Sequence, residues 1–357
     1  MKIDFVIASL SGGGAERVMV LLANKLSSLG YRVNIITFSP GLAYDLDDDV
    51  ELTNLHKSRI KNHSLRRFVS LLRYYKTKEN RPDVVISFIT LINLITIIAA
   101  KLFNIKVICS EHNSYLRAQS PVALTRFTRK VFYPKADFVT VLTAFDVPYY
   151  ESLKVNVKVM PNPCTFEPNV LEGLEKNKTI LAVGSLDRYH HKGFDNLIDI
   201  ADRVLRKRPE WKLKIIGGGD QGLKFLQEKV EKLNLQDSII FTGFRTDVKE
   251  IMAQSEVFIL SSRYEGLPMV LLEAMSQGMA CIAYDCKTGP SDIIVDNKNG
   301  ILVEDQNLDQ MSIQLANLLD DQNLRESLSE NGINSLKNFS IDSVISKWEV
   351  LFDSLKD

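Results

Sequence analysis

The stretch that decides the fold runs from Ser255 to Met275 and reads Ser-Glu-Val-Phe-Ile-Leu-Ser-Ser-Arg-Tyr-Glu-Gly-Leu-Pro-Met-Val-Leu-Leu-Glu-Ala-Met. Its apolar run Val257–Leu260 predicts a buried strand, and a short polar loop follows that strand. A helix is expected to begin near Pro268, because a residue without an N–H is tolerated in a first helical turn. The free N–H groups and the positive dipole end of such a helix favour an anion such as a phosphate.

Two glutamates flank this predicted anion site. Glu265 lies in the loop before the helix, and Glu273 lies in the helix itself. Carboxylates beside an anion site suit a ligand that has phosphate at one end and hydroxyl groups at the other, as a sugar nucleotide has. The alternative is an ordinary helix start with an unrelated surface glutamate on each side. This stretch alone leaves both interpretations open.

Length and composition indicate a soluble protein of two domains. The chain has 357 residues, of which 45% are hydrophobic and 25% charged, as in ordinary globular proteins. The N-terminal residues predict a first strand and not a signal peptide, and the apolar run Phe88–Ala100 is too short to span a bilayer. Four cysteines without Cys-x-x-Cys spacing predict reduced thiols in a cytoplasmic protein, not disulfides or a zinc site.

Charge is divided unevenly along the chain. Residues 1–165 carry 22 Lys and Arg against 13 Asp and Glu, a net charge of +9. Because the whole chain is neutral, residues 166–357 carry −9. This division predicts that the first half presents a basic face to an anionic partner.

Apolar runs alternate with helix-period segments along the whole chain, which predicts an α/β fold with two parallel sheets. The strands expected in the first half are Ile3–Ala8, Val33–Thr37, Val50–Leu55, Val84–Ser87, Val107–Ser110, Phe138–Leu142 and Val157–Met160. Those expected in the second half are Ile180–Val183, Leu213–Ile216, Ile239–Thr242, Val257–Leu260, Cys281–Tyr284 and Ile301–Val303. Between the halves, two prolines in Met160–Cys164 stiffen a predicted interdomain hinge.

A glycine-rich loop follows the first predicted strand, where Ser11–Val18 reads Ser-Gly-Gly-Gly-Ala-Glu-Arg-Val. Such glycines let the backbone approach a phosphate or a sugar in front of a helix start. A dinucleotide-binding fingerprint is disfavoured, because Arg17 stands at the third glycine position and Ile36–Pro40 offers no acid for a ribose. A plain tight turn remains an alternative.

Asp47-Asp48-Asp49 contains an Asp-x-Asp that could be taken for a metal-binding motif. It precedes a short predicted strand instead of following one, and its neighbours are typical of a turn. A solvated loop is therefore the preferred interpretation.

Two basic segments lie in the first half. Residues 57–81 hold nine Lys and Arg against the single acid Glu79. Within them, Leu65, Phe68, Val69, Leu72 and Tyr75 recur at helical spacing, with Arg66, Arg67, Arg73 and Thr77 turned away. This pattern predicts a helix that covers the sheet and exposes a basic face, or one that lies on an anionic membrane. The second segment adds weight to membrane docking; its basic residues are Arg117, Arg126, Arg129, Lys130 and Lys135, interleaved with Phe127, Val131, Phe132 and Tyr133. Nucleic acid is disfavoured, since no recognition module is visible.

Further candidate site residues follow predicted strands. His112, in Ser110-Glu111-His112-Asn113, stands where parallel sheets bind ligands, although a lone histidine also serves as a loop hydrogen-bonder. Gly184–Phe194 carries Arg188 and Lys192 in a glycine-loosened loop that suits a diphosphate. The segments Gly217–Asp220 and Phe241–Arg245 follow two more strands, and ordinary strand-end turns are their alternative.

The ordered set of motifs resembles the retaining glycosyltransferases of family 4. Glu265 and Glu273 match the family's Glu-x7-Glu signature, and Lys192 matches the lysine of its Gly-Arg-Leu…Lys-Gly motif. Ser185 stands where the family has an arginine and the loop looks about two residues longer, so it stays open whether Arg188 replaces that arginine. The Gly-Gly-Ala-Glu-Arg, Ser-Glu-His and Asn-Pro-Cys runs resemble bacterial enzymes of lipid-linked oligosaccharide synthesis, of the N-acetylgalactosaminyltransferase type.

This resemblance implies the GT-B fold, in which two Rossmann-like domains face each other across a cleft. Residues 1–163 would form the acceptor-side domain and residues 164–340 the nucleotide-sugar-binding domain. Residues 341–357 would form a helix that packs back on the first domain, through Trp348, Leu351 and Phe352.

The resemblance also implies the roles of the site residues. Those implied to act at the reaction centre are His112, Lys192 and Glu265. Those implied to bind the donor nucleotide are Arg188, Lys192, Gly218, Phe244, Arg245, Gly266, Leu267, Pro268 and Glu273. Those implied on the acceptor side are Gly13, Gly14 and Glu16. No cofactor and no metal are implied, because positive groups and the helix dipole would stabilise the diphosphate.

The implied activity is transfer of a hexose or N-acetylhexosamine, GalNAc as a first choice, from a UDP-sugar to an undecaprenyl-diphosphate-linked glycan. The enzyme would work on the cytoplasmic face of the membrane, against its anionic surface and without nucleic acid. One alternative is another GT-B enzyme, a UDP-sugar epimerase or a glycosyl phosphorylase. The other alternative is a non-catalytic, membrane-associated subunit that binds a UDP-sugar.

Overall fold

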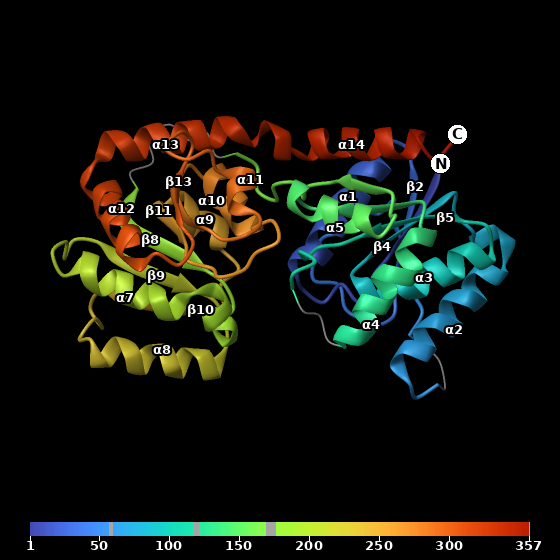
Figure 1. Cartoon of the computed structure of the whole chain (residues 1–357), viewed down its shortest axis with the longest axis horizontal. Helices are drawn as coiled ribbons and strands as arrows, with labels where there is room; N and C mark the ends of the chain where they lie inside the picture. Colours follow the sequence, from blue (N-terminus) through green and yellow to red (C-terminus); the bar gives the residue numbers. More distant parts are fainter. Residues whose placement is uncertain (57–59, 118–120, 169–175, 357) are drawn as a thin grey trace. The chain divides into compact units, whose positions relative to one another are not determined.

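The computed structural model describes residues 1–56, 60–117, 121–168 and 176–356. The chain forms two compact units (Figure 1). Unit 1 comprises Met1–Pro163 together with Ser340–Asp357, and unit 2 comprises Cys164–Phe339. The chain therefore leaves unit 1, builds unit 2, and returns to unit 1.

Unit 1 is built on a seven-stranded parallel sheet in the order β3-β2-β1-β4-β5-β6-β7. Its strands are β1 (Lys2–Val6), β2 (Arg32–Thr37), β3 (Glu51–Asn54), β4 (Val84–Phe88), β5 (Lys106–Ser110), β6 (Phe138–Val141) and β7 (Val157–Val159). Its helices are α1 (Gly14–Ser28), α2 (His63–Lys76), α3 (Thr90–Leu102), α4 (Val122–Phe127), α5 (Val147–Ser152) and α14 (Ile341–Asp353). A π-helical turn, η2 (Thr128–Phe132), continues α4.

Unit 2 is built on a six-stranded parallel sheet in the order β10-β9-β8-β11-β12-β13. Its strands are β8 (Asn177–Val183), β9 (Lys212–Ile216), β10 (Ile239–Gly243), β11 (Ser255–Leu260), β12 (Ala280–Asp285) and β13 (Ile301–Glu304). Its helices are α6 (Tyr189–Lys192), α7 (Phe194–Leu205), α8 (Asp220–Lys232), α9 (Val248–Ala253), α10 (Met269–Ser276), α11 (Pro290–Ile293), α12 (Leu308–Asp320) and α13 (Gln322–Ser335).

Both sheets confirm the predicted α/β fold of two parallel sheets, because every predicted strand is present. Central strands such as β1 and β11 are buried along nearly their whole length. Strands covered by helices on both faces are continuously apolar, and such runs are readily recognised in a sequence. In each sheet the strand order reverses once, between β1 and β4 in unit 1 and between β8 and β11 in unit 2. Open α/β sheets bind ligands at these positions, beyond the carboxyl ends of the strands.

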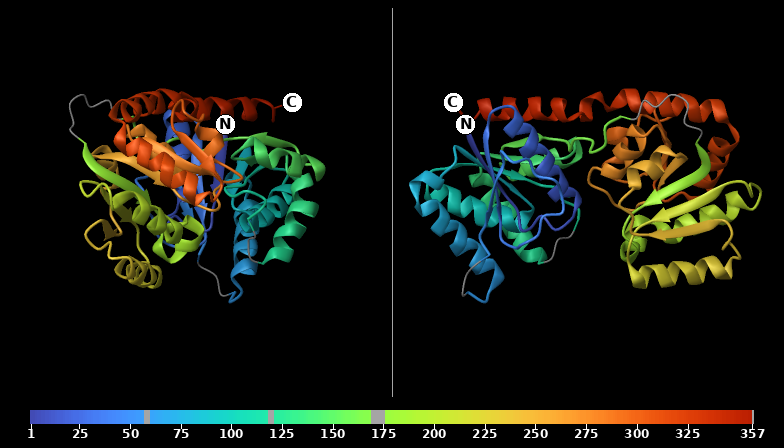
Figure 2. Two further views of the ribbon diagram at one scale, coloured as in Figure 1. Left: turned by 60° about the vertical axis from the view of Figure 1, so that its left-hand side comes forward. Right: turned by 180° about the vertical axis from the view of Figure 1, so that it is seen from behind.

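Helix α14 packs on α1 within unit 1 (Figure 2). Its Trp348 and Phe352 are buried, and the ring of Phe352 lies 6.0 Å from that of Tyr31. Lys25 of α1 forms an ion pair of 2.7 Å with Asp342. The apolar stripe of α14 thus belongs to the core of unit 1.

The basic helix α2 differs in part from its predicted pattern. Its Tyr75 is fully buried and Phe68 packs against the core, but Leu65 is 51% exposed. The helix ends at Lys76, so Thr77 lies beyond it. Leu65 stands in the first turn of the helix. Over the described residues, no helix has both the length and the hydropathy needed to cross a bilayer.

A carboxylic acid is buried at the centre of the first strand. Asp4 is completely buried, and its carboxylate accepts hydrogen bonds from Tyr75 (3.0 Å) and Asn34 (3.3 Å). Burial raises the pKa of Asp4 to about 7, although both hydrogen bonds act in the opposite direction. The folded protein therefore holds a proton here that the unfolded chain releases at a lower pH.

We expect this proton to make stability fall as the pH rises. The pKa of Asp4 is about 4 in the unfolded chain and higher in the folded protein. Its contribution to the free energy of unfolding is therefore full below about pH 4 and is lost as the pH rises through about 7. The loss amounts to at most about 4 kcal/mol. Asp4→Asn should remove this slope, as measured by urea unfolding between pH 5 and pH 8. Parallel pH profiles for the two proteins would contradict the assignment.

Candidate functional site

The two loops that carry the predicted donor residues lie at the strand reversal of unit 2. One loop, residues 184–193, follows β8, and the other, Ser261–Pro268, follows β11. Because β8 and β11 are neighbours in the sheet, both loops emerge side by side at its carboxyl edge. Residues 73 positions apart in the sequence are thereby brought into contact.

The central contact is an ion pair between Lys192 and Glu265. The Nζ of Lys192 lies 2.8 Å from Oε1 of Glu265, and the two side chains are only 15% and 11% exposed. The hydroxyl of Ser262 donates a second hydrogen bond of 2.6 Å to the same oxygen. Burial by itself would raise the pKa of Glu265, but the charge of Lys192 and these hydrogen bonds outweigh it and lower the pKa. Glu265 is therefore ionised at neutral pH.

Glycine 184 makes room for the lysine. A Cβ atom at this position would lie 3.2 Å from three carbons of the Lys192 side chain. The stem of Lys192 consequently lies flat on the backbone of the loop, with its ammonium group directed at Glu265. A larger residue at position 184 would push the stem away.

Helix α10 starts one residue later than Pro268, which lies at the N-cap position and not in the first turn. Leu267 and Pro268 are buried and hold the start of the helix, with Gly266 before them. Glu273, in the second turn of this helix, is only 9% exposed and accepts a hydrogen bond from Thr165. Both glutamates of the motif are therefore held by hydrogen bonds and are not loose surface groups.

The other residues predicted to bind the donor are more exposed or make fewer contacts with the two loops. The carbonyl of Gly218 accepts a hydrogen bond of 2.8 Å from Leu186, and Phe244, whose Cβ lies near Gly218, is 79% exposed. Arg245 forms an ion pair with Asp247, whose hydrogen bonds raise the pKa of the arginine. Arg188 is exposed and makes no side-chain hydrogen bond or ion pair with the residues that the structure describes.

His112 of unit 1 follows β5 and is held by a chain of hydrogen bonds. Thr140 donates to the hydroxyl of Ser110 (2.9 Å), which lies 3.2 Å from Nε2 of His112. The centre of the imidazole ring lies 4.1 Å from that of Phe88 with the two rings tilted by 35°, and its Nδ1 is buried without a partner among the described residues. Burial lowers the pKa of His112 to about 3, so the ring is neutral at physiological pH.

The glycine loop of unit 1 is held by its own glutamate. Glu16 accepts hydrogen bonds from the backbone N–H of Gly12 (2.7 Å) and from the hydroxyl of Ser9 (3.2 Å). The N–H of Gly13 donates to Tyr44, and Gly14 begins α1. Glu16 thus shapes the loop, as an acid in a first helical turn commonly does.

Comparison with known proteins identifies the family. Residues 165–335 match the family described as "Glycosyl transferases group 1", and residues 12–166 match "Glycosyltransferase Family 4". The chain is 33% identical to the GalNAc-alpha-(1->4)-GalNAc-alpha-(1->3)-diNAcBac-PP-undecaprenol alpha-1,4-N-acetyl-D-galactosaminyltransferase of Campylobacter jejuni, over 100% of this chain and 99% of that protein. This chain is a family 4 glycosyltransferase.

Solved structures show that the glycosyltransferase shares the GT-B fold. TarM of S. aureus superimposes with a TM-score of 0.82 at 16% identity, over 98% of both chains. HepE of Anabaena, in complex with UDP, superimposes with a TM-score of 0.80 at 17% identity, over 99% of this chain and 100% of that one. The predicted family and fold are confirmed.

Sequence reasoning missed a buried ion pair in unit 1 of the glycosyltransferase. Glu111, next to His112, is 1% exposed and lies 3.3 Å from Nη2 of Arg129, which is 4% exposed. Thr90 (2.7 Å) and Tyr133 also donate hydrogen bonds to Glu111. Burial alone would lower the pKa of Arg129, but the charge of Glu111 outweighs it and raises the pKa. Arg129 was predicted to be part of an exposed basic cluster, and that prediction is wrong.

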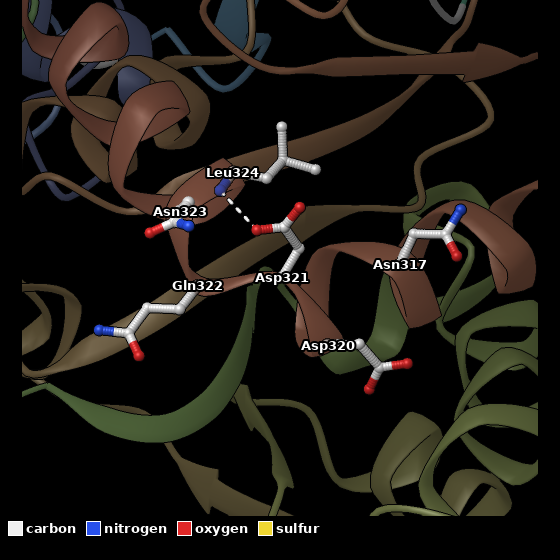
Figure 3. A pocket seen from close by; sticks show the side chains of 6 residues that line it. All are labelled: Asn317, Asp320, Asp321, Gln322, Asn323 and Leu324. Atoms are coloured by element: carbon white, nitrogen blue, oxygen red, sulfur yellow. Dashed lines mark hydrogen bonds between the residues drawn. The ribbon is translucent and has the colours of Figure 1, made fainter.

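A surface hollow of the glycosyltransferase lies at the turn between α12 and α13 in unit 2 (Figure 3). Its acids have structural partners: Asp321 accepts the N–H of Leu324 at the start of α13, and Asp320 forms an ion pair with Arg208. None of the predicted site residues lines this hollow. Asp47–Asp49 form an exposed turn, and over the described residues no His, Cys, Asp and Glu side chains gather as a metal site requires.

Proposed function

We propose that the glycosyltransferase moves a sugar from a UDP-sugar to a hydroxyl group of a lipid-linked glycan, with retention of configuration. The observation that carries the proposal is the pair of Lys192 and Glu265 beside the start of α10. A cation and a helix start suit a diphosphate, and a buried carboxylate suits the hydroxyl groups of a sugar. HepE, which has the same fold, binds UDP.

In the proposed reaction, the main task of the protein is to stabilise the negative charge that develops on departing UDP. Lys192 and the backbone N–H groups of Gly266, Leu267 and Met269 would stabilise this charge, because they are fixed in place before the reaction. The acceptor's proton would pass to a phosphate oxygen, so that no protein nucleophile is needed. Glu265 would bind hydroxyls of the transferred sugar, and Glu273 those of the ribose.

The unit 1 residues are proposed to act as neutral or structural groups. His112 would contact the transferred sugar as an uncharged hydrogen-bonding ring, since its pKa of about 3 leaves no charge at neutral pH. Gly13, Gly14 and Glu16 would shape the acceptor side.

In unit 2, Phe244, Arg245 and Gly218 would adjoin the base, and Arg188, which is exposed, would reach the diphosphate.

The Campylobacter relative supports the choice of substrates. Its name describes a GalNAc transferase that acts on a glycan linked to undecaprenyl diphosphate, and it matches this chain over its full length. We therefore propose UDP-GalNAc as the donor and an undecaprenyl-diphosphate-linked glycan as the acceptor.

We also propose that unit 1 works at an anionic membrane surface, on its cytoplasmic face. The segment formed by α4 and η2 exposes apolar side chains among basic ones, the combination that binds headgroups and acyl chains. The exposed apolar residues of this segment are Val122, Leu124, Phe127 and Val131. Its exposed basic residues are Arg126 and Lys130, and the exposed Lys135 follows it.

One experiment tests the reaction: incubation with a panel of UDP-sugars and undecaprenyl-diphosphate-linked acceptors, followed by mass spectrometry. We expect the acceptor mass to rise by one N-acetylhexosamine, with UDP-GalNAc the preferred donor. Conversion of the UDP-sugar without acceptor, or a need for inorganic phosphate, would indicate an epimerase or a phosphorylase. UDP binding without any turnover would indicate a non-catalytic subunit.

The same assay tests whether a metal is needed. We expect full transfer in excess EDTA, because Lys192 and the helix start supply the positive charge that a metal would otherwise provide. A strict requirement for Mn²⁺ would contradict this assignment.

A further inference from the structure

A second ion pair of unit 2 joins the same two chain segments as the Lys192–Glu265 pair. Arg263, in the same loop as Glu265, binds Asp195 with both ends of its guanidinium group. Its Nη1 lies 2.7 Å from Oδ1 and its Nη2 lies 3.0 Å from Oδ2, and the two side chains are 17% and 18% exposed. This forked geometry fixes both position and orientation, which a single hydrogen bond does not.

The same loop is also tied to the backbone on either side of Lys192. The guanidinium of Arg263 donates to the carbonyl of His190, and its backbone N–H donates to the carbonyl of His191 at 3.0 Å. Ser261 donates to the carbonyl of Lys192 itself at 2.9 Å. The three residues of the turn that end at Lys192 are therefore each bonded to the loop that carries Glu265.

Gly193 shows how closely the two segments approach. It has φ +67°, and a Cβ atom built on it would lie 1.9 Å from the carbonyl oxygen of Ser261. Only glycine permits both this backbone conformation and this distance. The turn and the loop therefore meet backbone to backbone, and the ion pair of Arg263 and Asp195 lies beside that contact.

We propose that Arg263 and Asp195 are positioning residues that hold the Lys192 turn against the Glu265 loop, so that the cation and the carboxylate form a prearranged pair. This inference rests on the proposed function, because it assigns the pair to donor binding. Each displacement of the turn would move the Lys192 ammonium relative to the helix start of α10. Even a small displacement of a binding group typically costs a site a large part of its advantage in binding and rate.

Arg263 is assigned a positioning role and not direct contact with the diphosphate because its charge is already neutralised. Asp195 binds both terminal nitrogens, and the carbonyl of His190 takes a further N–H. Lys192 remains the cation that faces Glu265. If Arg263 instead bound the diphosphate itself, removing the charge of Asp195 would leave UDP affinity unchanged or increase it.

The test uses Arg263→Lys, Asp195→Asn and the double variant, with UDP affinity measured by calorimetry and KM and kcat measured for transfer. Arg263→Lys keeps the charge and loses the fork. We expect each single variant to weaken UDP binding and raise the donor KM between about 10- and 100-fold. The double variant should bind UDP no more weakly than the single variant with the lower affinity, because both substitutions break the same ion pair.

Arg325 and Glu256 provide the matched control. They form another largely buried ion pair of unit 2, with 2.6 Å between Nε and Oε2 and side chains 10% and 19% exposed. Arg325→Lys should lower the Tm and leave the UDP affinity unchanged. Thermal unfolding of all variants separates loss of fold from loss of position.

The outcomes are distinct. Wild-type protein that binds no UDP would overturn the proposed function and this inference together. Wild-type protein that binds UDP, with Arg263→Lys and Asp195→Asn binding it equally well, would overturn the inference alone. Tighter binding by Asp195→Asn would also overturn it, in favour of direct contact between Arg263 and the diphosphate.

Discussion

Lys192→Ala is expected to reduce sugar transfer at least about 100-fold while leaving the fold intact. The substitution removes the ammonium group of Lys192, which contacts Glu265, and with it the fixed charge that would face departing UDP. Unit 2 should lose some stability but still fold, because Glu265 is 11% exposed, against 1% for Glu111, and keeps its hydrogen bond from Ser262. Initial rates of transfer and circular dichroism of the same preparation measure the two effects.

The loss should be specific to this lysine. Lys178 also forms an ion pair in unit 2, 3.8 Å from Glu210, but it lies near the start of β8, at the opposite end of that strand from the Lys192 loop. Lys178→Ala should therefore transfer sugar at the wild-type rate. Near-normal turnover by Lys192→Ala would show that the diphosphate is bound elsewhere.

Arg129→Met is expected to destabilise unit 1 by about 3 to 5 kcal/mol, which is enough to unfold many proteins at 37 °C. The variant leaves the carboxylate of Glu111 buried without its counter-charge, and methionine fills the space without replacing that charge. Urea unfolding followed by intrinsic fluorescence measures the change in the free energy of unfolding.

Two controls separate charge from packing. The double variant Arg129→Met with Glu111→Gln should recover much of the loss, because the neutral amide still accepts the hydrogen bonds from Thr90 and Tyr133. Lys101→Met breaks an ion pair of 2.7 Å with Asp137 near the surface and should cost less than about 1 kcal/mol. Equal losses for Arg129→Met and Lys101→Met would contradict the assignment.

The sequence predicts the sheets well because buried parallel strands are continuous apolar runs. It also predicts Lys192, Glu265 and Glu273 as site residues, since each lies in a loop or helix that follows such a run. It does not predict that Lys192 and Glu265 form an ion pair. That contact depends on β8 lying next to β11, and a strand order is not visible in the runs themselves.

Arg129 shows a second limit. At α-helical spacing it falls among exposed cations, but Thr128–Phe132 is a π-helical turn in which successive side chains advance by a smaller angle. The faces of the segment therefore shift, and Arg129 turns inward to Glu111. The burial of Glu111 was missed for another reason, because a carboxylate in the loop after a strand belongs to no apolar pattern that would mark it as buried.

The return of the chain to unit 1 at Ser340 has a consequence for biosynthesis. When a ribosome has released Phe339, unit 2 has all of its residues, whereas α1 still lacks the helix that covers it. Unit 1 is thus begun first but completed last, because all of unit 2 is translated before α14. A nonsense mutation just after Phe339 would yield a complete unit 2 attached to a unit 1 that lacks α14 and exposes apolar surface to chaperones and proteases.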